Sequence, residues 1–228
     1  MLLVDTADQD AILKALEFPG VQGFTTNPTL MARAAAAEVL SLDDYIAAAR
    51  KLCRMSTGIG AIRHLMIQAV GGADDAPKQA ALYLDDIKAA RDKKLWMKLT
   101  PTPMSLACCS ALKGMGCACL VTAVFTATQA YVAMEAGADG VAVYLGRLMR
   151  LETDWESQLE SIAAIVKSAE RTLLLASFPD RRTVEVGLRF SRDITAPPDV
   201  VDELLTSSLS QEAIEGFDEK VVIEMLKS

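Results

Sequence analysis

Short apolar segments recur along the chain and alternate with longer segments whose apolar positions follow a helical period. Most of the short segments are continuously apolar, which is typical of parallel strands covered on both faces. They predict strands at Leu2–Asp5, Gly23–Thr26, Leu65–Val70, Leu95–Leu99, Cys117–Thr122, Gly140–Leu145, Thr172–Ser177 and Arg192–Thr195. The longer segments predict amphipathic helices at Ser41–Met55, Lys78–Lys93, Ser105–Met115, Thr126–Ala136, Trp155–Ser168 and Gln211–Ser228.

Eight strand–helix units in 228 residues favour a (β/α)8 TIM barrel at the compact end of its size range. A doubly wound open sheet is the main alternative, but it typically has fewer strands and a glycine-rich first turn. No linker or low-complexity segment divides the sequence, so we expect residues 1–228 to form a single α/β domain. Residues 210–228 are expected to form an extra C-terminal helix that packs on a neighbouring subunit, which makes a homo-oligomer the expected state.

Composition narrows the classes of function. The net charge of −7 argues against a general nucleic-acid or membrane surface, and no apolar run is long enough for a transmembrane helix. The first residues lack the features of a signal peptide, so a cytoplasmic location is expected. The five cysteines form no C-x-x-C motif and are expected to be buried, reduced thiols rather than metal ligands. His64, the single histidine, is expected to enter a strand, and no nucleotide-binding glycine motif is present.

Polar residues fall at or just after the carboxyl end of every predicted strand, where TIM barrels build their active sites. Each has an ordinary structural explanation: Asp5 could cap the first helix, Asn27 could precede a helix opened by Pro28, and Thr122 or Tyr144 could simply fill the core. The gathering of all these residues around one barrel mouth nevertheless favours a functional site. The set comprises Asp5, Thr25, Thr26, Asn27, Gln68, Lys98, Thr122, Tyr144, Arg147, Ser177, Asp193 and Thr195.

Lys98 is unusual because it lies within the apolar segment Leu95–Leu99. Either its ammonium group reaches solvent at the strand end, or the site uses an uncharged amine. An apolar pocket lowers the pKa of a lysine from ~10.4, and a neutral amine can attack a ketone to form a Schiff base. The resulting positive charge is an electron sink for carbon–carbon cleavage without a metal or a cofactor. Candidates for the proton transfers are Tyr144, Asp5 and a water molecule held by Gln68 and Thr122.

Several motifs, in order from residue 4 to about residue 200, resemble the small transaldolase and fructose-6-phosphate aldolase family. The combination of the T-T-N-P segment with the lysine strand is the specific part. The motifs are Val4-Asp-Thr-Ala-Asp8, Gly23-Phe-Thr-Thr-Asn-Pro-Thr29, Leu95-Trp-Met-Lys98, Thr122-Ala-Val124, Val141-Ala-Val-Tyr-Leu-Gly-Arg147 and Ala176-Ser-Phe178.

The resemblance implies a (β/α)8 barrel that forms Schiff bases with dihydroxyacetone units of sugar phosphates, and that assembles as a pentamer or decamer. By position, Lys98 matches the Schiff-base lysine, while Asp5, Asn27 and the neighbouring Thr25 match residues that handle substrate hydroxyls. The group that holds the catalytic water and moves protons is matched by Gln68, Thr122 and Tyr144. The phosphate-binding group is matched by Arg147, Ser177 and Arg182. Arginine suits a phosphate because its guanidinium group is always charged and presents its N–H donors in a fork.

Two positions bear on the branch of the family. Transaldolases usually carry Glu and Phe where this chain has Gln68 and Tyr144, so the sequence favours the aldolase branch and keeps a transaldolase as the alternative. A non-catalytic sugar-phosphate-binding barrel is a third reading, but a binder has no need of a desolvated lysine. The chain also departs from the family pattern, because Pro101 follows the lysine one position late.

Overall fold

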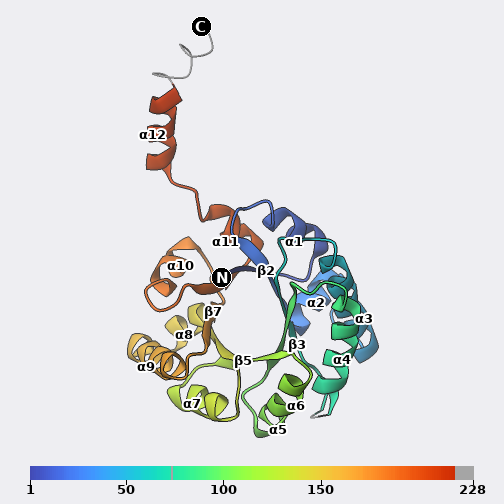
Figure 1. Cartoon of the computed structure of the whole chain (residues 1–228). Helices are drawn as coiled ribbons and strands as arrows, with labels where there is room; N and C mark the ends of the chain where they lie inside the picture. The colour runs from blue at the N-terminus through green and yellow to red at the C-terminus, as the bar shows by residue number, and fades with distance from the viewer. Residues whose placement is uncertain (73, 219–228) are drawn as a thin grey trace.

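A closed barrel of eight parallel strands forms the centre of the molecule in a computed structural model that describes residues 1–72 and 74–218. The strands follow one another around the barrel in sequence order, with helices on the outside (Figure 1). The expected (β/α)8 fold and all eight strands are confirmed, with small shifts at the strand ends. The strands are β1 Leu2–Asp5, β2 Val21–Thr25, β3 His64–Gln68, β4 Lys94–Leu99, β5 Ala118–Val124, β6 Gly140–Tyr144, β7 Thr172–Ala176 and β8 Asp193–Ala196.

Side-chain caps explain where several helices begin. The Asp8 carboxylate accepts a hydrogen bond from the Ala11 amide at the start of α1, Gln9–Ala15. Ser41 caps α3, Leu42–Ser56, and Thr126 forms a capping box at the start of α7, Ala127–Glu135. The remaining helices around the barrel are α2 Pro28–Ala34, α4 Asp75–Ile87, α5 Pro103–Leu106, α6 Cys109–Gly114, α8 Leu145–Leu151, α9 Trp155–Ser168, α10 Arg181–Gly187 and α11 Pro198–Glu203.

One predicted helix is divided in the structure. The segment Ser105–Met115 contains α5 and α6, and the residue that caps α5 is Thr102 rather than Ser105. The predicted helix Lys78–Lys93 is also displaced, because α4 begins and ends earlier. These differences lie in the outer layer of helices.

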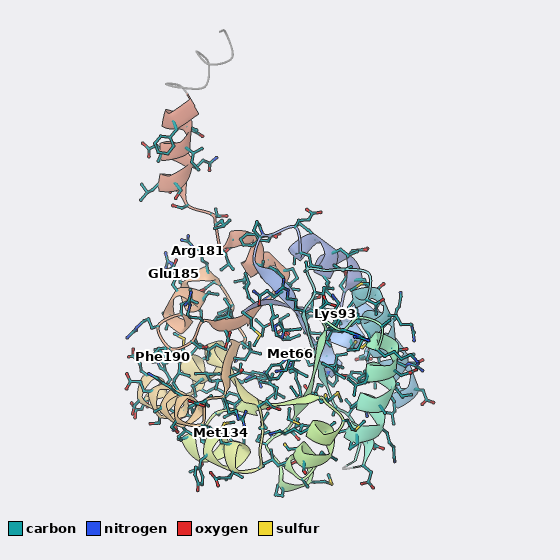
Figure 2. The ribbon with its side chains drawn as sticks, viewed as in Figure 1. Met66, Lys93, Met134, Arg181, Glu185 and Phe190 are labelled. Carbon is teal, nitrogen blue, oxygen red and sulfur yellow. The ribbon has the colours of Figure 1, made fainter. Side chains whose placement is uncertain are left out.

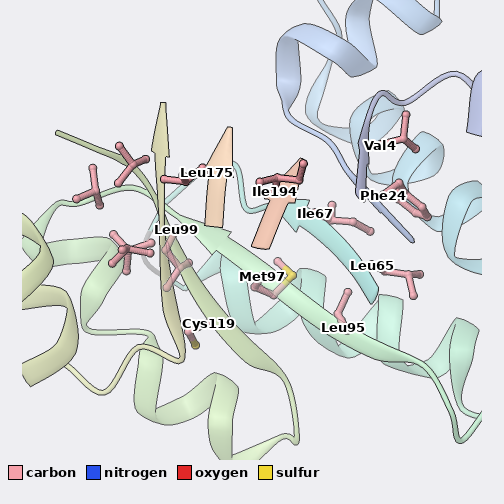
Figure 3. Packing of buried hydrophobic residues seen from close by; sticks show 14 of the residues in the cluster. Val4, Phe24, Leu65, Ile67, Leu95, Met97, Leu99, Cys119, Leu175 and Ile194 are labelled. Carbon is pink, nitrogen blue, oxygen red and sulfur yellow. The ribbon is translucent and has the colours of Figure 1, made fainter. Parts of the chain in front are cut away.

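The buried side chains form two layers. Alternate residues of the strands fill the inside of the barrel, where Met66 lies within the ring of strands (Figure 2). The other residues of the same strands, such as Phe24, Ile67 and Met97, pack outward against the helices (Figure 3). This two-sided burial is the reason why the strands read as continuous apolar segments. All five cysteines are buried free thiols.

The amino end of the barrel holds a residue that the sequence associated with the opposite end. Asp193 is the first residue of β8, and its carboxylate pairs with the amino group of Met1. The expectation that Asp193 contributes to the barrel mouth was therefore wrong, because the strand begins with it. His64 is the first residue of β3, as expected, and its Nδ1 accepts a hydrogen bond of 3.3 Å from the Trp96 indole.

Helix α12, Ser208–Asp218, projects away from the barrel beyond α11 (Figure 1). It accounts for the first part of the helix predicted at 210–228, and residues 219–228 lie outside the described residues. Three large apolar side chains of α12 are exposed: Leu209, Ile214 and Phe217. Within residues 1–72 and 74–218, none of the helices combines the length and the apolar character needed to cross a bilayer.

Candidate active site

A pocket of about 480 Å³ opens at the carboxyl ends of the strands. The parallel strands all point toward this end of the barrel, so their last inward-facing side chains converge there. Nine of the residues selected from the sequence line the pocket: Asp5, Asn27, Gln68, Lys98, Thr122, Tyr144, Arg147, Ser177 and Thr195.

Lys98 enters the pocket from β4 and is only 4 % exposed. Its neighbour Met97 packs outward, so strand alternation turns the lysine into the barrel. The Nζ atom donates a hydrogen bond of 3.0 Å to the main-chain oxygen of Thr26. Burial lowers the pKa of Lys98, and the nearby Asp5 opposes this effect. The amine therefore does not reach solvent at the strand end, and its environment favours the neutral form.

Asp5, the last residue of β1, lies within electrostatic reach of Lys98. Its carboxylate accepts a hydrogen bond of 2.6 Å from the Thr25 hydroxyl, and that hydroxyl lies 2.7 Å from the hydroxyl of Thr195. Burial raises the pKa of Asp5, while Lys98 and the bond from Thr25 oppose the increase. Asp5 does not cap the first helix, because Asp8 fills that role. Its carboxylate is thus available to the pocket.

A pair of hydroxyl groups from β5 and β6 lines the same pocket as Lys98. Thr122 donates a hydrogen bond of 3.1 Å to the hydroxyl of Tyr144. The Tyr144 ring is held edge-to-face against Phe125, with a centroid separation of 5.9 Å, and the guanidinium carbon of Arg147 lies 5.3 Å from its centroid. The pair can hold a water molecule or pass a proton at the pocket wall.

Asn27 and Gln68 supply amide groups. Asn27 also caps α2, because its Oδ1 accepts a hydrogen bond of 3.0 Å from the Leu30 amide. The ordinary explanation, that Asn27 precedes a helix opened by Pro28, is therefore correct as well. Gln68 ends β3, and its main-chain oxygen accepts a bond of 2.7 Å from the Tyr45 hydroxyl. The strand predicted at Leu65–Val70 therefore forms and brings Gln68 to the pocket.

The far side of the pocket combines a cation with a constrained turn. Ser177 has a φ of 66°, a left-handed conformation that is uncommon outside glycine, and its main-chain oxygen accepts from the Gly146 amide at 3.1 Å. A Cβ at Gly146 would lie 2.2 Å from that oxygen, so only glycine fits. This contact sets Arg147 beside Ser177, which gives the pocket one fixed positive charge and one hydroxyl.

Two of the residues to which the family resemblance gives a role do not reach the pocket surface. Thr25 is fully buried behind Asp5 and acts on it through the hydrogen bond. Arg182 is exposed on α10 and is absent from the pocket lining, while its neighbour Arg181 bonds the main-chain oxygen of Thr206 at 2.6 Å.

Other residues complete the pocket without having been assigned a role. The apolar ones come from strand positions that read as ordinary core, so the sequence carries no signal for them. Thr195 did carry a signal, since it falls near the carboxyl end of the eighth strand. This group contains Pro28, Thr29, Leu30, Ala142, Leu174, Ala176 and Thr195. Over residues 1–72 and 74–218, no group of three or more His, Cys, Asp or Glu side chains is arranged to hold a metal ion.

Comparisons with known proteins show which family this chain is similar to. The family model described as "Transaldolase/Fructose-6-phosphate aldolase" matches residues 2–227. A "Probable transaldolase 2" from Bacillus anthracis is 30% identical over 219 residues, which cover 94% of this chain and 94% of the relative. A "Probable fructose-6-phosphate aldolase" from Streptococcus pneumoniae is 28% identical over 235 residues, covering 99% of this chain and 98% of the relative.

Solved structures support the fold. The crystal structure of 2,3-dimethylmalate lyase, a member of the PEP mutase/isocitrate lyase superfamily, superposes with a TM-score of 0.58 at 13% identity, covering 97% of this chain and 83% of that one. At such low identity, the likeness concerns the barrel alone. Because the family model matches nearly the whole of this chain, the chain belongs to the transaldolase/fructose-6-phosphate aldolase family.

Proposed function

We propose that this protein is a class I aldolase that cleaves and forms the bond between a dihydroxyacetone unit and an aldose phosphate, with fructose 6-phosphate as the substrate to test first. The observation that carries the proposal is a lysine buried at the barrel mouth, with its pKa lowered by burial and a carboxylate nearby. A buried lysine without a chemical role is costly, because desolvation opposes its charge.

The reaction begins when the neutral Lys98 amine attacks the C2 ketone of the sugar. Loss of water gives a protonated Schiff base whose positive charge draws electrons from the C3–C4 bond. Asp5 accepts the proton of the C4 hydroxyl, the C3–C4 bond breaks, and glyceraldehyde 3-phosphate departs. An enamine of the three-carbon unit remains on Lys98.

Release of dihydroxyacetone requires a proton at C3 and then a water molecule at C2. The Thr122–Tyr144 hydroxyl pair, 3.1 Å apart, supports both steps together with the Gln68 amide. The phosphate of the substrate fits the end of the pocket that carries Arg147 and Ser177. The permanent positive charge of the Arg147 guanidinium attracts the phosphate although the protein as a whole is acidic. The chemistry needs no metal and no cofactor.

A transaldolase is the second candidate, because several relatives carry the name "Probable transaldolase". In that reaction the enamine waits for an acceptor aldehyde instead of being protonated. The Tyr144 hydroxyl favours the aldolase, since a phenylalanine at this position would leave the enamine without this proton donor.

Product release from fructose 6-phosphate without an acceptor aldehyde distinguishes the two activities. The aldolase proposal predicts that dihydroxyacetone accumulates over many turnovers. A single burst of glyceraldehyde 3-phosphate, equal to the number of subunits and followed by a stall, would identify a transferase. If neither product appears and no adduct forms on Lys98, the barrel only binds its ligand.

A further inference from the structure

The hydroxyl of Thr195 is connected to Asp5 through a second hydroxyl. Strand β1 lies between β2 and β8, so Thr25 on β2 and Thr195 on β8 face the inside of the barrel from either side of Asp5. The two hydroxyl oxygens are 2.7 Å apart, and Thr25 is 2.6 Å from the carboxylate. Thr195 is only 2 % exposed, and yet it lines the pocket.

The direction of these hydrogen bonds follows from counting protons. Each hydroxyl has one proton to donate, and an ionised carboxylate can only accept. The Thr25 hydroxyl donates its hydrogen bond to Asp5. In the contact with Thr195, the Thr25 oxygen can therefore only be the acceptor. Thr195 is therefore the donor. Successive hydroxyl groups polarise one another, which strengthens the bond that reaches the carboxylate.

We propose that Thr195 is a positioning residue that acts by donating a hydrogen bond to Thr25. Through Thr25 it holds the Asp5 carboxylate in the ionised form, and in the orientation, in which the carboxylate accepts the substrate proton. This role rests on the function proposed above and adds a residue to it. Asp5 does not touch Thr195 directly, so the effect passes through Thr25.

The surroundings of Asp5 explain why it needs this support. The charged or titratable groups that line the pocket with it are Lys98 on β4, Tyr144 at the end of β6 and Arg147 on α8. Lys98 is the one that lowers the Asp5 pKa, and a site that favours the neutral lysine weakens this help. The hydroxyl chain from Thr195 does not depend on the protonation of Lys98, so it holds the carboxylate ionised while the amine is neutral.

Steric filling is the ordinary explanation for a threonine in a strand, and valine would fill the same space. The hydroxyl is therefore the part to remove. Thr195→Val should raise the Asp5 pKa and move the acid limb of the kcat profile to higher pH by about 0.5–1 pH unit, which lowers kcat about three- to tenfold on that limb. Thr195→Ser keeps the hydroxyl and should restore both quantities.

The experiment compares wild type, Thr195→Val, Thr195→Ala and Thr195→Ser, with thermal unfolding to check that each variant is folded. Tyr83→Phe is the matched control, because Tyr83 is fully buried and, within the part of the chain that the structure describes, its hydroxyl has no hydrogen-bond partner. The readouts are kcat against pH for fructose 6-phosphate and a 13C NMR titration of aspartate carboxyls, with the Asp5 signal assigned by Asp5→Asn.

The proposal holds if the valine and alanine variants raise the Asp5 pKa and shift the acid limb while the serine and Tyr83→Phe variants match wild type. It is overturned if the folded valine or alanine variant titrates as wild type, or if serine does not restore the profile. The titration keeps the two proposals separate. If wild type forms no adduct and no product, the aldolase assignment fails, and the Asp5 pKa still decides the role of Thr195.

Discussion

Tyr144→Phe removes one hydroxyl and leaves the rest of the pocket wall in place. The ring keeps its edge-to-face contact with Phe125 at 5.9 Å and its position beside Arg147. The loss is the 3.1 Å bond from Thr122, a residue only 1 % exposed whose hydroxyl then has to find another partner. One such bond contributes about 0.5–1.5 kcal/mol to stability, so the variant should fold with a modest decrease in the free energy of unfolding.

The effect on turnover should be much larger than the effect on stability. A positioned proton donor typically contributes between about 10²- and 10⁴-fold to a rate, so dihydroxyacetone release without an acceptor should fall by that range. Formation of the Lys98 adduct should be retained, because the amine and Asp5 are unchanged. An added acceptor aldehyde should then draw the enamine into a transfer reaction, which would turn the enzyme toward transaldolase activity.

The assay follows dihydroxyacetone and transfer product separately, with and without acceptor aldehyde. Tyr131→Phe is the control, since Tyr131 lies on the surface of α7 and is 55 % exposed. If Tyr144→Phe released dihydroxyacetone at the wild-type rate, the hydroxyl would have no part in protonating the enamine, and the reason for preferring the aldolase would be lost.

Three further changes test other parts of the account. Asp5→Asn removes the charge that opposes the lowering of the Lys98 pKa, so adduct formation should extend to lower pH, and a measured shift to higher pH would contradict this. Gly146→Ala would place a Cβ 2.2 Å from the main-chain oxygen of Ser177, so calorimetry should record a lower melting temperature and phosphate-dependent binding should weaken. A variant with the melting temperature and binding of the wild type would refute the close approach. We expect α12 to hold subunits together, because its large apolar side chains are exposed and the family resemblance implies an oligomer. Deleting the chain from α12 onward should therefore lower the sedimentation coefficient by more than the lost mass accounts for, and a decrease explained by the lost mass alone would argue against assembly through α12.

The strands and the pocket could be predicted because both depend on strong local patterns. Continuous apolar segments fixed the strand positions, and the position of Lys98 or Gln68 within a strand determined that it faces the mouth. Asp193 was nevertheless placed wrongly: as the second residue of the predicted strand Arg192–Thr195 it belongs to the amino end of the barrel, where its carboxylate pairs with the Met1 amine.

Contacts between distant segments could not be read from the sequence. The hydroxyl chain from Thr195 joins residues on β8, β2 and β1, and nothing in the local pattern of these strands indicates which hydroxyls meet. The same holds for Arg182, whose exposure depends on how α10 packs rather than on its spacing from Ser177. The division of the predicted Ser105–Met115 helix had a local signal in Pro103 and Thr102, which open a short helix of their own.

Lys98 should form a Schiff base with the three-carbon unit. The most direct measurement incubates the protein with dihydroxyacetone, reduces the mixture with borohydride and determines the intact mass, followed by peptide mapping. We expect one reduced dihydroxyacetone unit per chain, located on Lys98 and absent from folded Lys98→Met and Lys98→Arg variants. A wild-type mass without the addition, or turnover retained in the folded Lys98→Met variant, would contradict it.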